Sequence, residues 1–241
     1  MDESFHVFPP EITGLLSAAG RRLMAGRHLL AGALRSSNFV AAKGLLDARL
    51  SRAIPELLKV TFEDLLVPLE QRTPDAFASQ VMGGELLRKT VRVLTTPTAN
   101  PPDPTLWKRA NDCGLVPMLQ STSFRRFIEA LAGFALVGPA GMQVLCYRPG
   151  DYAGPHTDHM PHLPDAKGGY LDIHLTFCTP GVKRQLIVYE QGGHFAGVQE
   201  LTTTGMVTAY RLPFWHYTTP LEGSPNARRW LVLASFLRSL T

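Results

Sequence analysis

Three side chains of metal-ligating type stand in the second half of the chain. His156 and Asp158 are two residues apart in the segment Pro-His-Thr-Asp-His, and His216 follows much later in Phe-Trp-His-Tyr. Residues two apart on an extended segment point to the same side, so His156 and Asp158 could reach one ion. Two imidazoles and one carboxylate on one face of a metal suit non-haem Fe(II), because they leave positions open for a co-substrate and oxygen. The pattern therefore predicts a metal site.

The third position of this site has two candidates. A histidine in an apolar strand is more often a packed core residue than a ligand, and His216 stands between apolar neighbours. His174, in another β-rich segment, is its rival. The strands between Asp158 and His216 could bring the two ends of a barrel together, which supports His216 as a ligand, and His174 stays open as the alternative.

Two arginines precede the last apolar segment, in Arg-Arg-Trp at 228–230. The guanidinium group suits a carboxylate, because it donates two parallel hydrogen bonds in a fork. Alternate residues of a strand share one side, so one of Arg228 and Arg229 must point inward, and we favour Arg229. An inward arginine would hold the distal carboxylate of a 2-oxoacid whose other end is on the metal. The alternative is that both arginines are surface charges.

Other motifs and polar residues play smaller parts. The sequence contains no Gly-x-Gly-x-x-Gly or phosphate-loop pattern, no Gly-x-Ser-x-Gly elbow, and no zinc-deaminase signature. Some polar and aromatic residues near the expected mouth of the site are candidates for substrate contact, although each could equally be structural. They are Tyr152, His159, Arg184, Tyr189 and Trp215.

The first half of the chain has apolar residues at helical spacing. The pattern predicts helices over about 10–34, 38–51, 55–69, 75–94, 106–112 and 123–131. Ser121 and Thr122 are candidate caps for the last of these. Residues 95–104 contain four prolines, which remove backbone donors and favour a loop.

After about residue 140, short β-rich runs alternate with Gly and Pro, as in a barrel or sandwich. The runs are 142–147, 170–179, 185–189, 206–210, 215–219 and 230–237. A sheet must bury one face, so we expect the helices to cover it. The prediction is one catalytic domain over 1–241, mainly helical over 1–139 and mainly β over 140–241.

Composition limits the class of protein. The chain has 241 residues and a net charge of +4, which is too weak a basic character to indicate nucleic-acid binding. Its three cysteines form no Cys-x-x-Cys pair, which argues against a disulfide framework or a structural zinc site. The start, Met-Asp-Glu-Ser, is acidic where a signal peptide is basic, and the longest apolar run, 127–145, is interrupted by Gly and Pro. We expect a cytoplasmic protein without membrane association.

The ordered set of site residues resembles the Fe(II)/2-oxoglutarate-dependent dioxygenases, especially the prolyl 4-hydroxylase-like branch. The residues that carry the resemblance are Tyr147, Gly150, His156, Asp158, His216, Arg229 and Trp230. It covers residues 140 to 237 and implies an α+β fold, with a double-stranded β-helix, or jelly roll, and the N-terminal helices packed on it. Leu231 departs from the family, which often has a serine there.

The resemblance also implies the chemistry. His156, Asp158 and His216 would bind Fe(II), Arg229 would hold 2-oxoglutarate, and Tyr147 would add a hydroxyl to it. Oxygen would be consumed, 2-oxoglutarate decarboxylated to succinate, and a small molecule or peptidyl side chain hydroxylated; ascorbate is a further candidate cofactor. Two alternatives stay open: a non-catalytic jelly-roll binding module, and a cupin-type metal enzyme that does not use 2-oxoglutarate.

Overall fold

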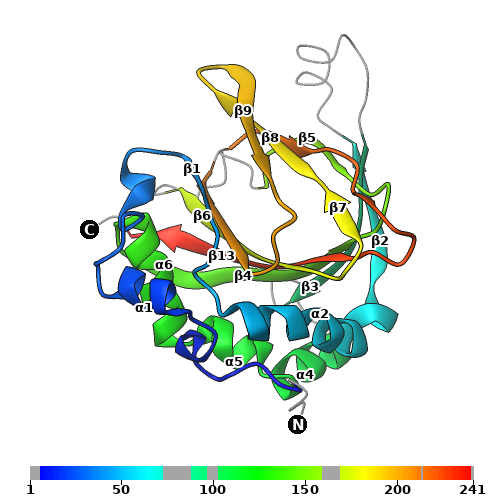
Figure 1. The fold of residues 1–241 in the computed structure, drawn as a ribbon, viewed down its shortest axis with the longest axis horizontal. Coiled ribbons are helices and arrows are strands. Elements are labelled where there is room, and N and C mark those ends of the chain that lie inside the picture. Colours follow the sequence, from blue (N-terminus) through cyan, green and yellow to red (C-terminus); the bar gives the residue numbers. More distant parts are fainter. Residues whose placement is uncertain (1–5, 73–87, 97–102, 159–168, 213, 240–241) are drawn as a thin grey trace.

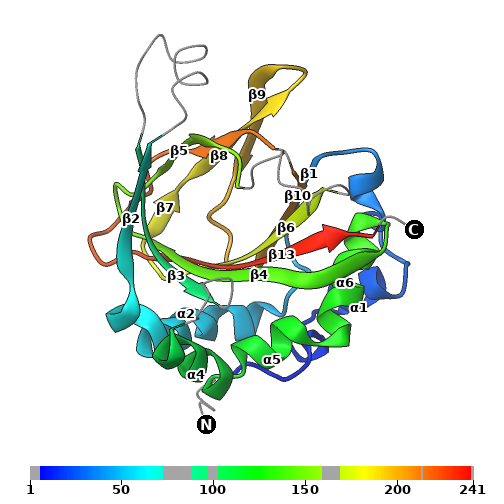
Figure 2. The same ribbon diagram turned by 180° about the vertical axis from the view of Figure 1, so that it is seen from behind.

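The computed structural model describes residues 6–72, 88–96, 103–158, 169–212 and 214–239. Two antiparallel sheets face one another, and helices pack on the outside of the larger sheet (Figures 1 and 2). The space between the sheets holds the expected metal ligands together with Arg229 and Tyr147, whereas the space between the larger sheet and the helices is apolar. The helices therefore support one wall of the site from behind.

The larger sheet has the strand order β1-β10-β6-β13-β4-β3-β2. Its strands are β1 (Phe39–Ala42), β2 (Val67–Arg72), β3 (Arg88–Thr96), β4 (Leu136–Tyr147), β6 (Tyr170–Cys178), β10 (Met206–Arg211) and β13 (Arg229–Arg238). The last strand, β13, lies at the centre between β6 and β4. The C-terminal segment is thus tied into the sheet along both of its edges.

The smaller sheet has the order β5-β11-β8-β9. Its strands are β5 (Ala153–His156), β8 (Leu186–Gln191), β9 (His194–Glu200) and β11 (His216–Thr218), beside a two-stranded ribbon of β7 (Val182–Arg184) and β12 (Glu222–Gly223). Gly192 and Gly193 join β8 to β9 with φ of 61° and 84°. Two consecutive positive φ angles are what a tight hairpin turn requires, and glycine adopts them without strain.

Five α-helices and three short 3-10 helices are present in the described part of the chain. They are α1 (Ala18–Met24), α2 (Ala48–Phe62), α4 (Pro104–Asp112), α5 (Leu115–Gln120), α6 (Thr122–Ala132), η1 (Ile12–Gly14), η2 (Ala33–Arg35) and η3 (Glu63–Leu65). Side-chain caps begin the longer ones: Asp47 for α2, Asp103 for α4 and Ser121 for α6. The expected cap at Ser121 is confirmed, and its hydroxyl accepts from the amide of Phe124.

The alternation of β13 divides its side chains between two environments. Trp230, Val232, Ala234 and Phe236 belong to the core against the helices, whereas alternate residues from Arg229 onward line the space between the sheets. This is the period-2 pattern of a strand with a different layer on each face. The same strand therefore anchors the helical layer and contributes to the site.

Replacement of Phe124 by alanine is expected to destabilise the fold by about 3–5 kcal/mol, as for other buried phenylalanines. Phe124 of α6 is fully buried, with its ring centroid 6.0 Å from that of Phe236 on β13. Chemical denaturation would measure the change. Val60→Ala is the control, because Val60 is 72% exposed and should change the unfolding free energy by less than about 0.5 kcal/mol. A Phe124→Ala variant as stable as this control would contradict the packing of α6 on the sheet.

Several expected helices are wrong in part. Residues 39–42 form strand β1, not the start of a helix over 38–51, and residues 88–94 belong to strand β3, not to a helix over 75–94. Residues 95 and 96, expected in a loop, belong to β3, which continues to Thr96. Both segments pair with distant strands, and this tertiary pairing outweighs local helical spacing. Residues 75–87 and 97–102 lie outside the described residues.

Two other expected helices differ in extent. The helical pattern over 10–34 is divided into η1, α1 and η2, with Gly26 and Gly32 at φ of 69° and 71°. The pattern over 55–69 belongs to α2, which starts earlier, at Ala48, and then to β2 from Val67. The first 139 residues thus supply three strands of the larger sheet as well as the helices. By contrast, α4 and α6 lie where the sequence predicts them.

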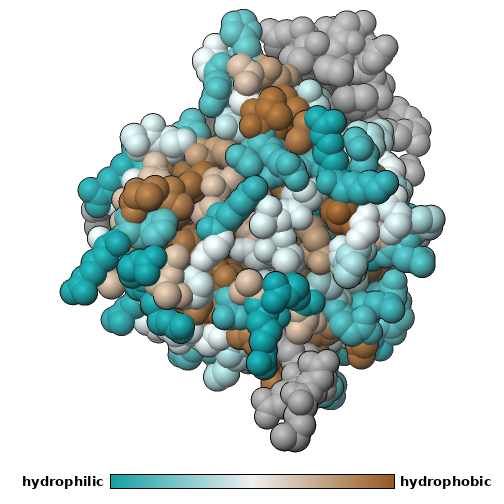
Figure 3. All heavy atoms as spheres, viewed as in Figure 1, coloured by the Kyte–Doolittle hydropathy of each residue, from teal (hydrophilic) through white to brown (hydrophobic). Residues whose placement is uncertain are grey.

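The outer surface mixes hydrophilic and hydrophobic groups. Figure 3 shows brown groups scattered among teal ones on this face. The exposed large hydrophobic side chains come from separate parts of the chain: Val7, Leu29, Val60, Val67, Val137 and Val198. Of the helices in the described residues, none combines the length and the apolar character that a membrane crossing needs.

Candidate metal centre and its cavity

The structure brings His156, Asp158 and His216 together. His156 ends β5 and lies directly opposite His216, the first residue of the neighbouring antiparallel strand β11, while Asp158 follows just after β5. The ring centroids of the two histidines are 4.4 Å apart. One ligand atom from each of the three residues lies within 4.8 Å of the others. Strand pairing thus places the distant His216 beside the local His-x-Asp pair.

Backbone carbonyls orient both imidazoles. Nδ1 of His156 lies 2.6 Å from the carbonyl oxygen of Gly154, and Nδ1 of His216 lies 3.0 Å from that of Phe214. We assign the proton to Nδ1 in each ring, because a carbonyl can only accept; each Nε2 then presents a lone pair. This is the usual outer contact of a metal-ligating histidine.

The two Nε2 atoms face the carboxylate of Asp158. The distance from Nε2 of His156 to Oδ1 is 3.1 Å, and that from Nε2 of His216 to Oδ2 is 3.8 Å. Three lone-pair donors this close repel one another unless a proton or a metal cation lies between them. The donor set, with nitrogen and oxygen ligands and no sulfur, therefore fits a transition-metal ion of the non-haem iron type.

Two further residues extend this cluster on the larger sheet. The hydroxyl of Tyr210, a fully buried residue of β10, lies 2.5 Å from Oδ2 of Asp158 and 2.9 Å from Nε2 of His174 on β6. Burial, followed by the charge of Asp158, raises the pKa of Tyr210 well above its ordinary value, so the phenol stays protonated. His174 is outside the three-residue ligand cluster. The rival to His216 thus contacts the tyrosine instead.

One cavity between the sheets is lined both by this cluster and by Arg229. The guanidinium is buried, with 1% of the residue exposed, and its partners are neutral. Nε donates to the carbonyl of Leu201 at 3.2 Å, and Nη1 donates to Oε1 of Gln185 at 3.0 Å. Burial lowers the pKa of Arg229, yet a guanidinium stays charged at any physiological pH. Among the described residues no carboxylate pairs with it, so the cavity ends in a cation without an anion.

The other arginine of the pair faces away from the cavity. Arg228 donates through Nη1 to the carbonyl oxygens of Pro225 and Ala227, at 3.1 and 2.8 Å. It is Arg229, the residue favoured from strand alternation, that points inward. Tyr147 lies opposite Arg229 on β4, with the guanidinium 5.3 Å from the centre of its ring. Burial raises the pKa of Tyr147 to about 12, so its hydroxyl is a neutral donor at physiological pH.

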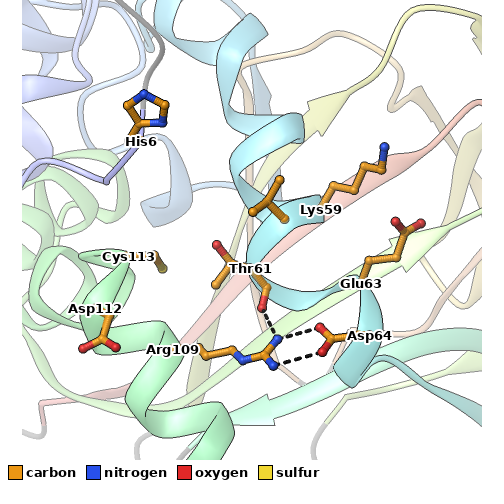
Figure 4. Close-up of a pocket in the computed structure, with 9 residues that line it drawn as sticks. His6, Lys59, Thr61, Glu63, Asp64, Arg109, Asp112 and Cys113 are labelled. Atoms are coloured by element: carbon orange, nitrogen blue, oxygen red, sulfur yellow. Dashed lines mark hydrogen bonds and ion pairs between the residues drawn. The ribbon is translucent and has the colours of Figure 1, made fainter.

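A second, shallower hollow lies among the helices, away from the metal cluster. Figure 4 shows one ion pair in it: Arg109 of α4 donates to both oxygens of Asp64, at 2.6 and 2.9 Å, and to the carbonyl of Thr61 at 3.1 Å. The hydrogen bond from Arg109 lowers the pKa of Asp64. The ion pair joins α4 to η3, and the hydrogen bond to Thr61 joins α4 to the last turn of α2. We interpret these contacts as structural, because they hold neighbouring helical segments together.

No protein-family model matches the sequence, and no curated protein matches it. Solved structures match most of its length. A prolyl-4-hydroxylase from Pseudomonas putida superposes with a TM-score of 0.55 at 15% identity, over 90% of this chain and 100% of that one. A 2-oxoglutarate-Fe(II) oxygenase family protein from Burkholderia pseudomallei gives 0.51 at 16%, over 91% of both chains. The carbocyclase SnoK of nogalamycin biosynthesis gives 0.53 at 14%, over 95% and 87%.

The chain has the fold of the 2-oxoglutarate-Fe(II) oxygenases. This confirms the expected α+β jelly roll with helices packed on it, including the likeness to prolyl hydroxylases. Because unrelated activities share folds, the chemistry must be argued from the residues of the cavity.

Within the oxygenase fold, the proposed substrate residues are dispersed. None of Tyr152, Arg184, Tyr189 and Trp215 lines the described cavity. Arg184 is exposed on the β7–β12 ribbon, and Tyr152 and Trp215 are half-buried. The ring of Tyr189 packs 4.5 Å from that of Phe39, at the edge of the aromatic cluster beside the metal centre. His159 lies outside the described residues.

Sequence reasoning missed two residues of the site. Tyr210 stands in an expected strand, where alternation places it on the same side as Thr208, a cavity residue. That alternation was the available signal. Gln185, which is fully buried and orients Arg229, lies between β7 and β8, and its amide nitrogen also donates to the carbonyls of Asp151 and Thr219. No periodic pattern points to it.

Proposed function

We propose that the protein is an Fe(II)/2-oxoglutarate-dependent oxygenase that hydroxylates a small molecule or a peptidyl side chain. The observation that carries the proposal is Arg229, a buried cation at the end of a cavity that begins at a histidine-carboxylate cluster. A bare metal site or a simple binding module has no need of this arrangement. A co-substrate with one end on the metal and an anionic group at the other end accounts for both features.

The metal ligands in this proposal are His156, Asp158 and His216. The two Nε2 atoms and one carboxylate oxygen would hold Fe(II) on one face, with the Nδ1 contacts to Gly154 and Phe214 keeping the rings aligned. When bound, the iron supplies oxygen activation coupled to decarboxylation of 2-oxoglutarate to succinate. The protein contributes ligand orientation and a cavity enclosed between the sheets.

The co-substrate site in this proposal is the stretch from the cluster to Arg229. The guanidinium would bind the distal carboxylate of 2-oxoglutarate, replacing water with a charge-assisted pair. The hydroxyl of Tyr147 is a neutral donor on the same side, and apolar side chains such as Ile187 and Leu231 would contact the methylene groups. Leu231 thus serves as a wall where related enzymes often have a serine.

The primary substrate in this proposal meets a more polar part of the cavity. Gln143, Leu233, His174 and Thr208 are register neighbours across β4, β13, β6 and β10, and all four line the cavity. This row is four residues along β13 from Arg229, or about 13 Å at strand spacing. The site therefore favours a substrate with hydrogen-bonding groups. Similar structures include a prolyl hydroxylase and a carbocyclase of natural-product biosynthesis, so both substrate types stay in the proposal.

We expect 2-oxoglutarate to bind only when the metal is present. Calorimetric titration of the anaerobically prepared protein with 2-oxoglutarate, with and without Fe(II), measures this directly, and succinate release on admission of air measures turnover. Metal binding without 2-oxoglutarate binding would favour a cupin-type enzyme that uses no 2-oxoacid. A folded protein that binds neither would favour a non-catalytic module.

A further inference from the structure

We propose that Tyr210 is a positioning residue that holds Asp158 so that a single carboxylate oxygen meets the metal. The inference rests on the proposed function, because it concerns how a proposed iron ligand is oriented. Its basis is the geometry around one carboxylate, in which the two oxygens have different neighbours.

The two carboxylate oxygens of Asp158 have different neighbours. Oδ1 lies 3.1 Å from Nε2 of His156, inside the donor cluster, whereas Oδ2 accepts a hydrogen bond from the hydroxyl of Tyr210 at 2.5 Å. Oδ2 also lies 3.8 Å from Nε2 of His216, a longer distance than the one from Oδ1 to His156. A hydrogen bond to a charged carboxylate is stronger than one between neutral groups. Rotation of the carboxylate to bring both oxygens onto a metal would break this bond.

The number of open positions on the metal explains why this matters. Three single-atom ligands leave three positions on a six-coordinate ion, enough for two co-substrate atoms and one oxygen. A carboxylate that binds through both oxygens takes one of those positions. By keeping Oδ2 occupied, Tyr210 preserves the third open position.

The direction of the hydrogen bonds defines the role of His174. An ionised carboxylate only accepts, so the Tyr210 hydroxyl donates to Asp158, and its oxygen is left to accept from Nε2 of His174 at 2.9 Å. His174 therefore fixes the rotation of the hydroxyl. The ring itself is held by stacking on Phe214, 4.9 Å away, which in turn stacks on His216 at 5.3 Å. Tyr210 thus has one available position.

The test is Tyr210→Phe, which removes the hydroxyl and keeps the ring. Co(II) is the probe, because its visible absorption reports coordination number without turnover. We expect the Kd for Co(II) to rise by about 10- to 100-fold, the usual range for loss of an outer contact to a ligand. We also expect the absorption of the Co(II) complex with 2-oxoglutarate to change, since the carboxylate becomes free to bind through both oxygens.

Matched variants separate this role from general damage. Tyr217 follows His216 in the sequence, and its ring packs on Phe195 outside the cavity. Tyr217→Phe should therefore leave the Kd for Co(II) within about twofold of wild type. His174→Leu should weaken Co(II) binding less than Tyr210→Phe does. His174→Gln keeps an N–H donor and should bind Co(II) as wild type does. If the Tyr210→Phe variant had the same Kd for Co(II) and the same spectrum as wild type, this inference would be overturned and the proposed function would not be affected. Failure of the folded wild-type protein to bind Co(II) would overturn the proposed function and this inference together.

Discussion

Asp158→Ala is expected to abolish metal-dependent decarboxylation of 2-oxoglutarate, with at least a ~100-fold loss of succinate formation. Loss of an outer contact to a ligand typically costs 10- to 100-fold, and Asp158 is itself the carboxylate of the ligand cluster. The two remaining imidazoles are neutral, so the variant offers the cation no compensating charge. The hydroxyl of Tyr210 also loses its acceptor at 2.5 Å, which disturbs the cluster further.

Two measurements decide this prediction: metal content after desalting, and succinate formed from 2-oxoglutarate in air. Asp112→Ala is the matched control, because Asp112 is an exposed carboxylate of α4 whose partner is Lys108 on the surface. Such surface ion pairs contribute little to stability. An Asp158→Ala protein that kept wild-type metal content and succinate yield would remove Asp158 from the proposed ligand set.

Two of the three candidate metal ligands could be grouped from the sequence because they are close together in the chain. His156 and Asp158 share one side of an extended segment by the period of a strand, and this needs no knowledge of the fold. His216 was harder, since its pairing with β5 is a long-range event; the order of residues within a known family pattern supplied what spacing could not. Alternation along the last strand required one of Arg228 and Arg229 to point inward and left the choice between them open. The structure places Arg229 on the cavity side, with Trp230 buried on the other face.

The parts that sequence reasoning missed depend on contacts between distant segments. Strand β1 is four residues long and exists as the edge partner of β10, with Phe39 opposite Tyr210. Local apolar spacing cannot reveal such a strand, because its hydrogen bonds lie far away in the chain. The same holds for Gln185, whose value lies in orienting Arg229 from a connecting segment. Substrate residues were hardest to assign, because loops and side chains of several strands define the mouth together.

Arg229→Gln is expected to weaken 2-oxoglutarate binding by about 100-fold while metal binding persists. Loss of one partner from a buried, hydrogen-bonded charge pair costs about 2–5 kcal/mol, and about 3 kcal/mol corresponds to roughly 100-fold in affinity. Gln185 and the carbonyl of Leu201 accept hydrogen bonds from Arg229. Glutamine removes the charge and keeps one amide donor for these acceptors. Arg229→Lys keeps the charge without the planar fork, so its affinity for 2-oxoglutarate should lie between those of wild type and Arg229→Gln.

The controls for Arg229 use its neighbour and the metal. Arg228→Gln changes an arginine whose guanidinium contacts the carbonyls of Pro225 and Ala227, so its calorimetric Kd for 2-oxoglutarate should stay within about twofold of wild type. Co(II) binding by Arg229→Gln should match wild type, because Arg229 is outside the group of three possible ligands. If Arg229→Gln bound 2-oxoglutarate normally, the buried cation would serve some other anion, and a cupin-type enzyme would become the better interpretation. If Arg229→Gln lost 2-oxoglutarate binding but still bound the metal, the result would favour an oxygenase of this class over a bare metal site.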